Sequence, residues 1–484
     1  MLHATRARVR QHGPDSFTQA AISSKDVSEG SLFVALRGVT RDGHDYVRDA
    51  IDRGAVGILV NRGVDVPLGV TVIEAPDTLQ AFHDLAGALR RKYSPRTIAI
   101  TGSAGKTTTK DMVAHVLQSK FDVLRSARSH NNHLGVPLTL SSLEHAHSHA
   151  VIEIGTNNKG EIGKLAALVA PDLGVVTNVG YAHIGNFGSQ EEIAAEKVSL
   201  FDHVPVGGAC IINGDDVLLG AVVKRSLNGS GKRVFSVGFN ARNDVWVESV
   251  ESHENGVLGI VRYAGESARF FVGVPGRHFV YAALFAIAVG LESGIGLEGS
   301  AEVLRSFVPP SGRSTLIRLR PDLVVLDDSH NASPDAVLAA LNLLEELPGT
   351  IKIAVLGEMR ELGEKTAELH ALVGARAAAA VSHLVTVGPD GELMVAAAVN
   401  GGLDARKTWC VPSARDALPL IQQILAGATG ASAVLVKGSR FTHMERVSLG
   451  LHGRTVSCGL ANCRLYINCS ACPQLAVDGE AGER

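Results

Sequence analysis

The chain has 484 residues, of which 45% are hydrophobic and 20% are charged, and 46 basic against 49 acidic residues leave a formal net charge of −3. This composition is typical of a folded globular protein and excludes a disordered, collagen-like or coiled-coil chain. The near balance of charge offers no general attraction to nucleic acid, so we expect no nucleic-acid partner. A single core rarely exceeds about 250–300 residues, so the length predicts roughly three domains.

Three further features predict the location of the protein. The apolar run from Val280 to Val289 is shorter than the roughly 20 residues that span a bilayer, so membrane insertion is not expected. The first ten residues, MLHATRARVR, lack the apolar segment of a secretory signal. Six cysteines are too few for a disulfide scaffold in a chain of this length. We therefore expect a cytoplasmic protein whose cysteines are reduced.

Residues 1–85 are predicted to form a small N-terminal α/β domain that binds a substrate. In this prediction residues 31–38 (SLFVALRG) contain a strand, and residues 45–60 form a helix that runs into a second strand. Residues 78–93 form a helix that ends before Pro95, because proline cannot continue it.

Residues 86–306 are predicted to form a central domain with a parallel sheet. From Thr97 onward, apolar runs (TIAITG, AVIEIG, LGVVTNVG and ACIING) alternate with helical stretches. This alternation is typical of a parallel sheet with helices on both faces. A more polar, strand-like section follows at about 233–275, and an alanine-rich helix at about 278–293.

After a linker-like break near residues 308–312, the alternation restarts and predicts a Rossmann-like C-terminal domain over residues 307–450. Its predicted strands are LVVLDD, KIAVLGE, LVTVG and AVLVKGS. Residues 451–484 are a Cys-containing tail of unknown role. The predicted fold class is therefore α/β with three domains.

Polar residues follow the buried runs of both predicted parallel sheets. They are Thr101, Gly102, Glu153, Asn178, Asp327, Asp328, Glu358 and Lys437. Ligands of open parallel sheets bind at this carboxyl edge. Two such edges predict a cleft in which two substrates are joined.

A glycine-rich loop between the first central strand and the next helix indicates a phosphate site. In such loops, backbone N–H groups and a helix N-terminus face an anion, a lysine reaches the outer phosphates, and a hydroxyl is positioned for Mg²⁺. The loop residues are Gly102, Ser103, Ala104, Gly105, Lys106, Thr107 and Thr108. Ile100 stands where the generic P-loop pattern has its first glycine, so an ordinary βα turn is the alternative.

Nine motifs occur in order over about residues 20–447. They are SLFVALRGVTRDGHDYV, TGSAGKTTTK, NNHLGVPLTL, VIEIGTNNKGEI, TNVGYAHIGNFGS, AAEKVSLF, LDDSHNASPDAV, VLGEMRELGE and VLVKGSR. On these motifs the sequence resembles the Mur ligases of bacterial cell-wall synthesis. Within that family it is most similar to the members that join UDP-N-acetylmuramoyl-tripeptide and D-alanyl-D-alanine. The resemblance implies a monomeric, ADP-forming amide ligase of peptidoglycan precursor synthesis, with ATP and these two compounds as its partners.

The resemblance further implies that the γ-phosphoryl group of ATP activates a carboxylate, and that an amine attacks the resulting acyl phosphate. Lys106 is then the phosphate cation, and Thr107 and Glu153 are oxygen ligands for Mg²⁺. His183 completes a second metal shell, so two Mg²⁺ ions are expected. The residues alone leave alternatives open, because Glu153 could cap the next helix and His183 could be a turn histidine.

Lys197 aligns with a lysine that the family carries in carbamylated form, and the resemblance implies that it holds the second Mg²⁺ as an anion. By its pattern alone, Lys197 is a solvated lysine on the surface of a helix. Asn131 and Asn132 match paired asparagines next to substrate and phosphates, and an Asx-turn is the alternative.

The outer domains supply the other residues that the resemblance implies. The C-terminal residues expected to hold the nucleotide or the amine component are Arg313, Asp328, Asn331, Lys437, Ser439 and Arg440. Asp328 is counted with Lys106, His183 and Lys197 as catalytic, and His278 is expected at the nucleotide. The residues expected near the uridine diphosphate are Ser24, Lys25, Asp42, Gly43 and His44. Surface salt bridges in the C-terminal domain, and a hairpin with an Asp-Gly turn in the N-terminal domain, are the alternatives.

The sequence departs from the family at five of the expected contact positions. Phe279 and Ala282 replace two asparagines near the adenine, so either hydrophobic packing replaces these contacts or nucleotide affinity is reduced. His330, Glu358 and Lys25 replace a tyrosine, an aspartate and an arginine, and the lysine lacks the bidentate fork of arginine.

The tail and the function leave alternatives open. The tail cysteines Cys458, Cys463, Cys469 and Cys472 have C-x4-C-x5-C-x2-C spacing, and only the last pair resembles a zinc knuckle. We expect a variable tail without zinc, with structural zinc as the alternative. The alternative functions are another Mur-type ligase with a different amine and a nucleotide-binding homologue that has lost catalysis.

Overall fold

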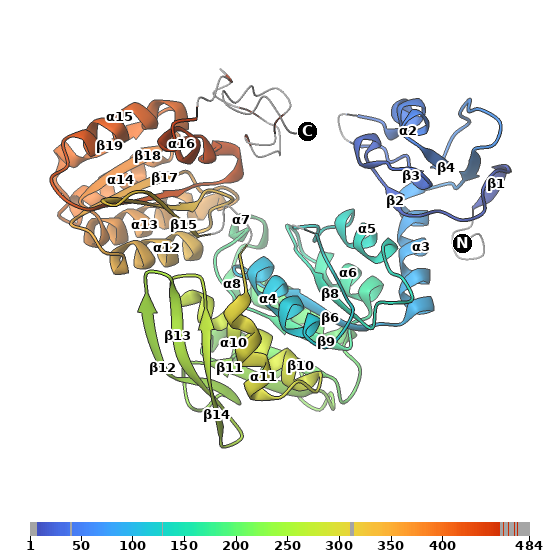
Figure 1. The fold of residues 1–484 in the computed structure, drawn as a ribbon, viewed down its shortest axis with the longest axis horizontal. Coiled ribbons are helices and arrows are strands. Elements are labelled where there is room, and N and C mark those ends of the chain that lie inside the picture. Colours follow the sequence, from blue (N-terminus) through green and yellow to red (C-terminus); the bar gives the residue numbers. More distant parts are fainter. Residues whose placement is uncertain are drawn as a thin grey trace.

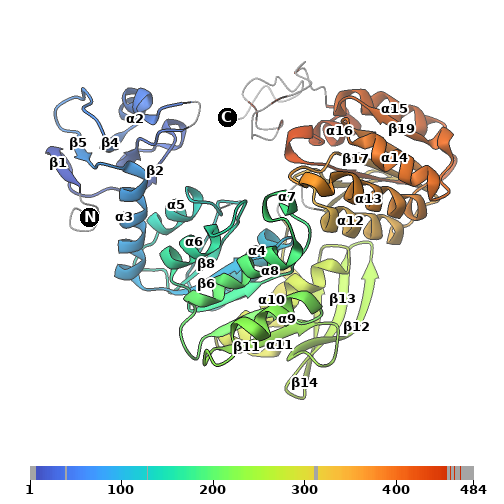
Figure 2. The same ribbon diagram turned by 180° about the vertical axis from the view of Figure 1, so that it is seen from behind.

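The computed structural model describes residues 7–38, 41–127, 129–309 and 314–454, together with Cys458, Cys463, Cys469 and Cys472. In this part of the chain, three sheets of five, nine and six strands follow one another along the sequence. The N-terminal and C-terminal sheets lie on either side of the central one (Figure 1, Figure 2). This arrangement confirms the predicted α/β fold class with three domains.

The N-terminal sheet has the order β1-β5-β4-β3-β2, with β1 antiparallel to β5 and the other pairs parallel. Its elements are β1 (Arg8–Gln11), β2 (Ala20–Ala21), η1 (Ser24–Asp26), β3 (Ser31–Val34), η2 (Gly43–Tyr46), α2 (Val47–Asp52), β4 (Ala55–Val60), β5 (Thr71–Glu74) and α3 (Thr78–Tyr93). Helix α3 begins at Asp77, whose carboxylate accepts hydrogen bonds from two N–H groups that a helix start leaves unpaired. The strand and helix predicted over 31–38 and 78–93 are confirmed.

The central sheet has the order β14-β13-β12-β11-β10-β9-β6-β8-β7. Its strands are β6 (Arg96–Thr101), β7 (Val123–Arg125), β8 (His149–Glu153), β9 (Leu173–Val176), β10 (Ala209–Asn213), β11 (Arg233–Gly238), β12 (Val245–His253), β13 (Gly256–Tyr263) and β14 (Glu266–Val272). The pairs from β7 to β12 are parallel, and β12, β13 and β14 form an antiparallel edge. The strand-like section predicted at 233–275 comprises β11 and this antiparallel edge.

The central helices are α4 (Lys106–Gln118), α5 (Gly135–Ser141), α6 (Glu161–Val169), α7 (Ile184–Phe187), α8 (Gln190–Val198), η3 (Ser199–His203), α9 (Val217–Ser226), α10 (His278–Glu292), α11 (Leu297–Val303) and η4 (Leu304–Ser306). Helix α10 packs against α4 and the sheet, so its long apolar run lies in the central core. Among the residues that the structure describes, no helix is long and apolar enough to cross a membrane.

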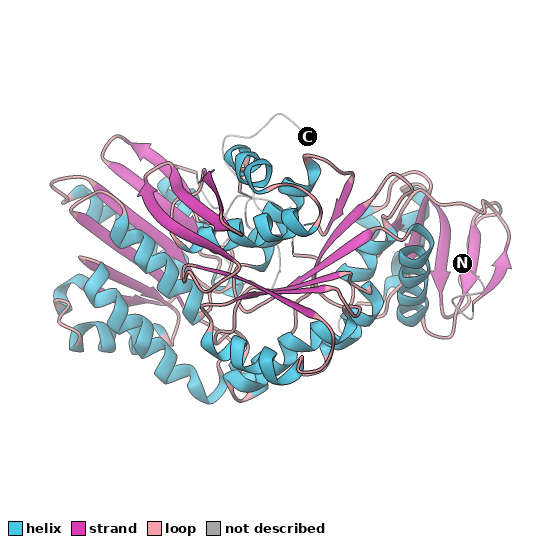
Figure 3. Cartoon of the chain, turned by 90° about the horizontal axis from the view of Figure 1, so that it is seen from below, coloured by secondary structure: helices cyan, strands magenta, loops and turns pink. Residues whose placement is uncertain are grey.

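The C-terminal sheet has the order β15-β16-β20-β17-β18-β19, parallel except for β15. Its elements are β15 (Thr315–Arg320), β16 (Leu323–Asp328), α12 (Pro334–Glu346), β17 (Ile351–Gly357), η5 (Gly363–Lys365), α13 (Thr366–Ala380), β18 (His383–Val387), α14 (Gly391–Asn400), η6 (Ala405–Lys407), β19 (Thr408–Val411), α15 (Ala414–Ala426), β20 (Ser432–Lys437), η7 (Arg440–Thr442) and α16 (Glu445–Leu451). Alternate residues of β20 enter two cores, Ala433 and Leu435 with α12 to α14 and Val434 and Val436 with α15 and α16. Burial on both faces explains the unbroken apolar runs, and Figure 3 shows the resulting layers of helices and strands.

Loops at the carboxyl ends of the central and C-terminal sheets are in contact. The N–H of Tyr181 donates to the carboxylate of Asp335 in α12 (2.7 Å), and the N–H of Gly185 donates to the carbonyl of Glu361 (3.0 Å). A Cβ atom on Gly185 would lie 2.6 Å from the nitrogen of Gly363, so only glycine permits this approach of the two backbones. The polar edges of the two sheets therefore meet.

Candidate active site

The glycine loop lies between β6 and α4 and is fastened to the loop after β9. The N–H groups of Ser103 and Ala104 donate to the backbone oxygen (3.1 Å) and side-chain Oδ1 (2.9 Å) of Asn178, and the Thr177 hydroxyl donates to the carbonyl of Ala104 (2.7 Å). Two N–H groups of the loop thus hold its shape. Helix α4 begins directly after this loop, at Lys106, and helix N-termini of this kind attract anions.

Gly102 is required at its position by both backbone conformation and space. Its φ of +151° is one that residues with a side chain rarely adopt, and a Cβ atom would lie 1.8 Å from Oγ1 of Thr177. The loop therefore requires glycine at position 102, although Ile100 replaces the first glycine of the generic P-loop motif.

Two lysines lie close together at this loop. The ammonium group of Lys106 donates to the carbonyl of Gly102 (2.7 Å). Lys197 in α8 is only 2% exposed, and its burial, together with the charge of Lys106, lowers its pKa from 10.5 to about 7. The alternative of a solvated surface lysine is therefore wrong. Much of its amine is uncharged at neutral pH.

Burial of Lys197 follows from the position of α8. The neighbouring Glu196 accepts hydrogen bonds from the N–H groups of Gly160 (2.6 Å) and Ile162 (2.8 Å) at the start of α6. The Glu196 carboxylate satisfies two N–H groups that would otherwise be unpaired at the start of α6. These bonds keep the face of α8 that carries Glu196 packed against α6.

Glu153 ends β8 beside the glycine loop and is 1% exposed. Its Oε1 accepts a hydrogen bond from Nδ2 of Asn131 (2.7 Å), whereas no donor among the described residues reaches its Oε2. On the neighbouring strand, the buried Oγ1 of Thr101 also has no hydrogen-bond partner in the described part of the chain. Buried oxygens without donors are costly, and a hard cation would satisfy them.

The alternative of a helix cap is wrong for Glu153, whereas the alternative of an Asx-turn is correct for Asn132. Helix α6 is preceded by Gly160 and capped by Glu196, so Glu153 does not cap it. Oδ1 of Asn132 accepts hydrogen bonds from the N–H groups of Leu134 (3.1 Å) and Gly135 (2.9 Å), which is the Asx-turn before α5. Asn131 instead turns toward Glu153. The two asparagines thus have different local roles.

His183 precedes α7 in a left-handed conformation (φ 62°), as a turn histidine, and it is also paired across the domain contact. Its Nδ1 is in direct contact with Oε2 of Glu361 from the C-terminal domain. Hydrogen bonding to His183 lowers the pKa of the Glu361 carboxyl. Sequence spacing gave no indication of this partner.

In the C-terminal domain, Asp328 and Lys437 form a buried ion pair at the ends of β16 and β20. Lys437 also donates to the carbonyl of Asn331 (2.9 Å), and the N–H of Ser314 donates to Asp328 (3.0 Å). The alternative of a surface salt bridge is wrong for this pair, because the Lys437 side chain is 3% exposed.

Other predicted C-terminal residues surround this pair. Nη1 of Arg440 lies 3.1 Å from Nε2 of His330. The buried Oγ of Ser439 has no hydrogen-bond partner among the described residues. Glu358, which replaces an expected aspartate, accepts two hydrogen bonds from the guanidinium of Arg360 (2.7 and 2.9 Å). Arg313 lies outside the described residues.

His278, at the start of α10 in the central domain, lies close enough to Asp328 and Lys437 of the C-terminal domain for their charges to affect its pKa. Desolvation lowers the pKa of His278 to about 4, with Asp328 opposing and Lys437 adding to the shift. The neighbouring Phe279 and Ala282 are each 5% exposed and belong to the central core. Hydrophobic packing thus accounts for both residues that replace asparagines.

The predicted N-terminal residues have mainly local contacts. Nδ1 of the buried His44 lies 2.6 Å from Oδ1 of Asp42, and Nε2 accepts a hydrogen bond from the N–H of Asn61 (3.2 Å). Gly43 is required because a Cβ atom would lie 2.7 Å from the nitrogen of Leu36. Ser24 is buried, whereas Lys25 is exposed. The structure does not bring this group to the glycine loop.

Four residues of the site were not among the predicted contact residues: Asn178, Glu196, Asp335 and Glu361. Asn178 had been noted only as a polar residue after a buried strand. Glu196 and Asp335 lie in helices and Glu361 in a loop, and their contacts lie in other parts of the chain, so the sequence pattern did not separate them from surface acids.

Together, a phosphate loop at one sheet edge and a charged pair at the facing edge define a nucleotide-dependent enzyme that works between two domains. Three family models match the chain: "Mur ligase family, catalytic domain" at residues 17–91, "Mur ligase middle domain" at residues 100–290 and "Mur ligase, glutamate ligase domain" at residues 312–440.

Similar proteins agree over nearly the whole length. The UDP-N-acetylmuramoyl-tripeptide–D-alanyl-D-alanine ligase of Bacillus subtilis is 32% identical, covering 88% of this chain and 91% of the relative. That of Escherichia coli is 33% identical with the same coverage. The structure of MurF from Acinetobacter baumannii matches with a TM-score of 0.84 at 29% identity, covering 93% of this chain and 97% of its own. The chain belongs to the Mur ligase family and is an ATP-dependent ligase of the MurF type.

Proposed function

We propose that the protein joins D-alanyl-D-alanine to the tripeptide carboxylate of UDP-N-acetylmuramoyl-tripeptide, with ATP as the source of energy, in peptidoglycan precursor synthesis. The observation that carries the proposal is the buried Glu153 beside the glycine loop, with one carboxylate oxygen that no described donor reaches. The names of the relatives above state this activity for those proteins. All residues of the proposed site belong to one chain, so a monomer would suffice for the reaction, which we expect to take place in the cytoplasm.

In this proposal each domain has one task. Residues 1–85 hold the uridine diphosphate part through Ser24, Lys25 and the loop Asp42–Gly43–His44. Residues 86–306 bind ATP, and residues 307–450 bind the amine component. The local contacts of His44 and Asp42 would then hold a binding loop in shape.

The triphosphate would lie at the start of α4, where Lys106 faces its outer phosphates. Thr107 and Glu153 would hold Mg²⁺, and Asn131 would orient Glu153 through its hydrogen bond. Bound magnesium supplies positive charge that stabilises the transferring phosphoryl group. Lys106 would move from the loop carbonyls to the phosphates when ATP enters.

Lys197 would act after it has become a carbamate. A neutral amine attacks CO₂, a C–N bond forms and one proton is released, which leaves an anion. Because burial brings the pKa of Lys197 to about 7, the neutral form is abundant at physiological pH. The carbamate would be a ligand of the second Mg²⁺, with His183 as another.

The C-terminal residues would receive the nucleotide and the amine. Asp328 and Asn331 would contact both, while Lys437, Ser439 and Arg440 would meet a carboxylate or phosphate, and Arg313 would reach the nucleotide. With a pKa of about 4, His278 is neutral at pH 7 and offers an uncharged imidazole to the nucleotide.

The test is phosphate release from ATP by the purified full chain. We expect release only when UDP-N-acetylmuramoyl-tripeptide and D-alanyl-D-alanine are both present. Transfer of ¹⁸O from the tripeptide carboxylate to phosphate would support the acyl phosphate. Lys106→Ala should abolish turnover while the thermal midpoint stays near that of wild type, and retained turnover would contradict the assigned role. Activity with a single amino acid instead of the dipeptide would favour another Mur-type ligase.

A further inference from the structure

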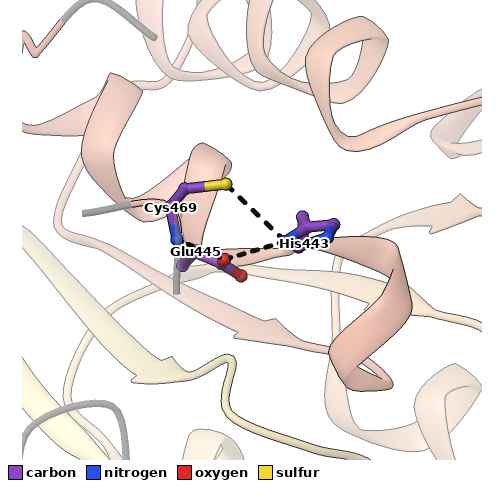
Figure 4. Close-up of side chains that lie close together, drawn as sticks. All are labelled: His443, Glu445 and Cys469. Atoms are coloured by element: carbon purple, nitrogen blue, oxygen red, sulfur yellow. Dashed lines mark hydrogen bonds and ion pairs between the residues drawn. The ribbon is translucent and has the colours of Figure 1, made fainter. Parts of the chain in front are cut away.

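A cluster of ligand atoms lies where Cys469 contacts the C-terminal domain. His443 and Glu445 stand at the start of α16, and Cys469 comes from the tail (Figure 4). All three residues are buried, at 2%, 8% and 3% exposure. None of the three residues is assigned to the ligase reaction.

The three ligand atoms lie within 4.8 Å of one another, and two of their separations are close to those around one zinc ion. Nδ1 of His443 lies 3.6 Å from Sγ of Cys469 and 3.1 Å from Oε1 of Glu445. In a tetrahedral site, zinc bonds of about 2.0–2.3 Å place nitrogen, oxygen and sulfur ligands about 3.3–3.6 Å apart. A small shift of the carboxylate is enough to accept the ion.

Each ligand group is also held by a second contact of the kind that orients metal ligands. The ring Nε2 of His443 lies 3.1 Å from the carbonyl oxygen of Cys463. A proton on Nε2 directs the Nδ1 lone pair toward the thiol and the carboxylate. The N–H of Cys469 donates to Oε1 of Glu445 (3.0 Å), and Nε of Arg446 donates to Sγ of Cys469 (3.2 Å). This guanidinium contact fixes the position of the sulfur that would bind the ion.

We propose that His443 Nδ1, Glu445 Oε1 and Cys469 Sγ bind one Zn²⁺ ion, with solvent at the fourth position. Neutral histidine, carboxylate and thiolate balance the two charges of the ion. The ion fastens the tail to the first turn of α16. The cysteine spacing could not reveal the site, because two of its three ligands lie outside the tail.

The site also reaches the carboxyl edge of the C-terminal sheet. Cys463, whose carbonyl holds His443, lines a cavity of about 390 Å³ together with Glu358 and Arg360. These two residues follow β17, on the edge where the amine component is proposed to bind. Zinc would thus fix one wall of this cavity.

The test uses the full chain without an affinity tag, purified in reductant. After reconstitution and dialysis, we expect about one zinc per chain by mass spectrometry, in agreement with the one such cluster among the described residues. With Co²⁺ as the probe, we expect a thiolate-to-cobalt charge-transfer band. Cys469→Ser should remove this band, and His443→Asn, which suits the left-handed backbone (φ 48°), should weaken zinc binding by more than about 100-fold.

The matched control is Cys472→Ser, a change in the same tail outside the cluster, which should keep zinc and the cobalt band. Wild-type protein that holds no zinc after reconstitution overturns the proposal, and so does equal binding by wild type and Cys469→Ser. Equal loss in Cys472→Ser would show that the ligand set is wrong. Binding is measured without turnover, so failure here leaves the ligase function untouched.

Discussion

The burial of Lys197 has a cost in stability that can be measured directly. We choose Lys197→Met, which keeps an unbranched chain of similar length and removes the amine. The unfolded chain holds the proton up to pH about 10.4, whereas the folded protein releases it near pH 7. Between these values the unfolded state binds more protons, so folding stability rises with pH.

The magnitude follows from the two pKa values. The buried amine disfavours folding by about 4 kcal/mol at pH 7 and by about 2 kcal/mol at pH 9. These are upper bounds, because water and side chains adjust to a buried charge. We therefore expect Lys197→Met to be more stable than wild type by up to about 4 kcal/mol at pH 7, with a smaller gain at pH 9 and no ligase turnover.

The assay is urea unfolding at pH 7 and pH 9 in CO₂-free buffer, which keeps Lys197 as the free amine. A Trp409→Phe background leaves Trp246 in β12 to report on the central domain. Lys164→Met on α6 is the matched control, since Lys164 is exposed and its loss should change stability by less than about 0.5 kcal/mol. The reasoning is refuted if Lys197→Met is no more stable than wild type at pH 7, or if the difference does not change with pH.

Three other substitutions test the rest of the site. Glu153→Gln keeps the size of the side chain and removes its charge, so ATP binding should lose its dependence on Mg²⁺ in calorimetry with and without the ion. Lys437→Met removes the buried cation from the partly buried Asp328 carboxylate and should cost about 3–5 kcal/mol in denaturant unfolding, and an unchanged midpoint would contradict the assigned pair. Glu361→Ala removes the partner of His183 and should raise the Mg²⁺ concentration for half-maximal turnover by about 10- to 100-fold, whereas a purely structural contact would alter only the thermal midpoint.

The fold could be predicted because burial on both faces of a parallel sheet leaves a local signal. Every residue of β20 is buried, and its sequence SAVLVK is a short apolar run that ends in Lys437, one of the predicted site residues. The same logic found the glycine loop, since strand, glycines and helix follow one another directly. Each of these features depends on residues close in sequence.

Partners far apart in the sequence gave no such signal. Helix α8, with the sequence QEEIAAEKV, has the composition of an exposed helix, yet Glu196 and Lys197 are buried because Glu196 caps α6. Likewise, Cys469 lies beside His443 and Glu445 only in the folded chain. Such contacts follow from packing between elements, which the spacing of residues does not encode.

The pairing of His183 with Glu361 reconciles two hypotheses that the sequence left as alternatives. A carboxylate on Nδ1 favours a proton on that nitrogen and leaves the lone pair of Nε2 for a metal ion, the arrangement that orients histidine ligands in many metal sites. His183 can thus be a turn histidine and a ligand at once. Because Glu361 belongs to the C-terminal domain, it orients His183 only while the two domains are in contact. The glycine contact between Gly185 and Gly363 sets that approach, so the proposed second metal site depends on the domain arrangement as well as on its own residues.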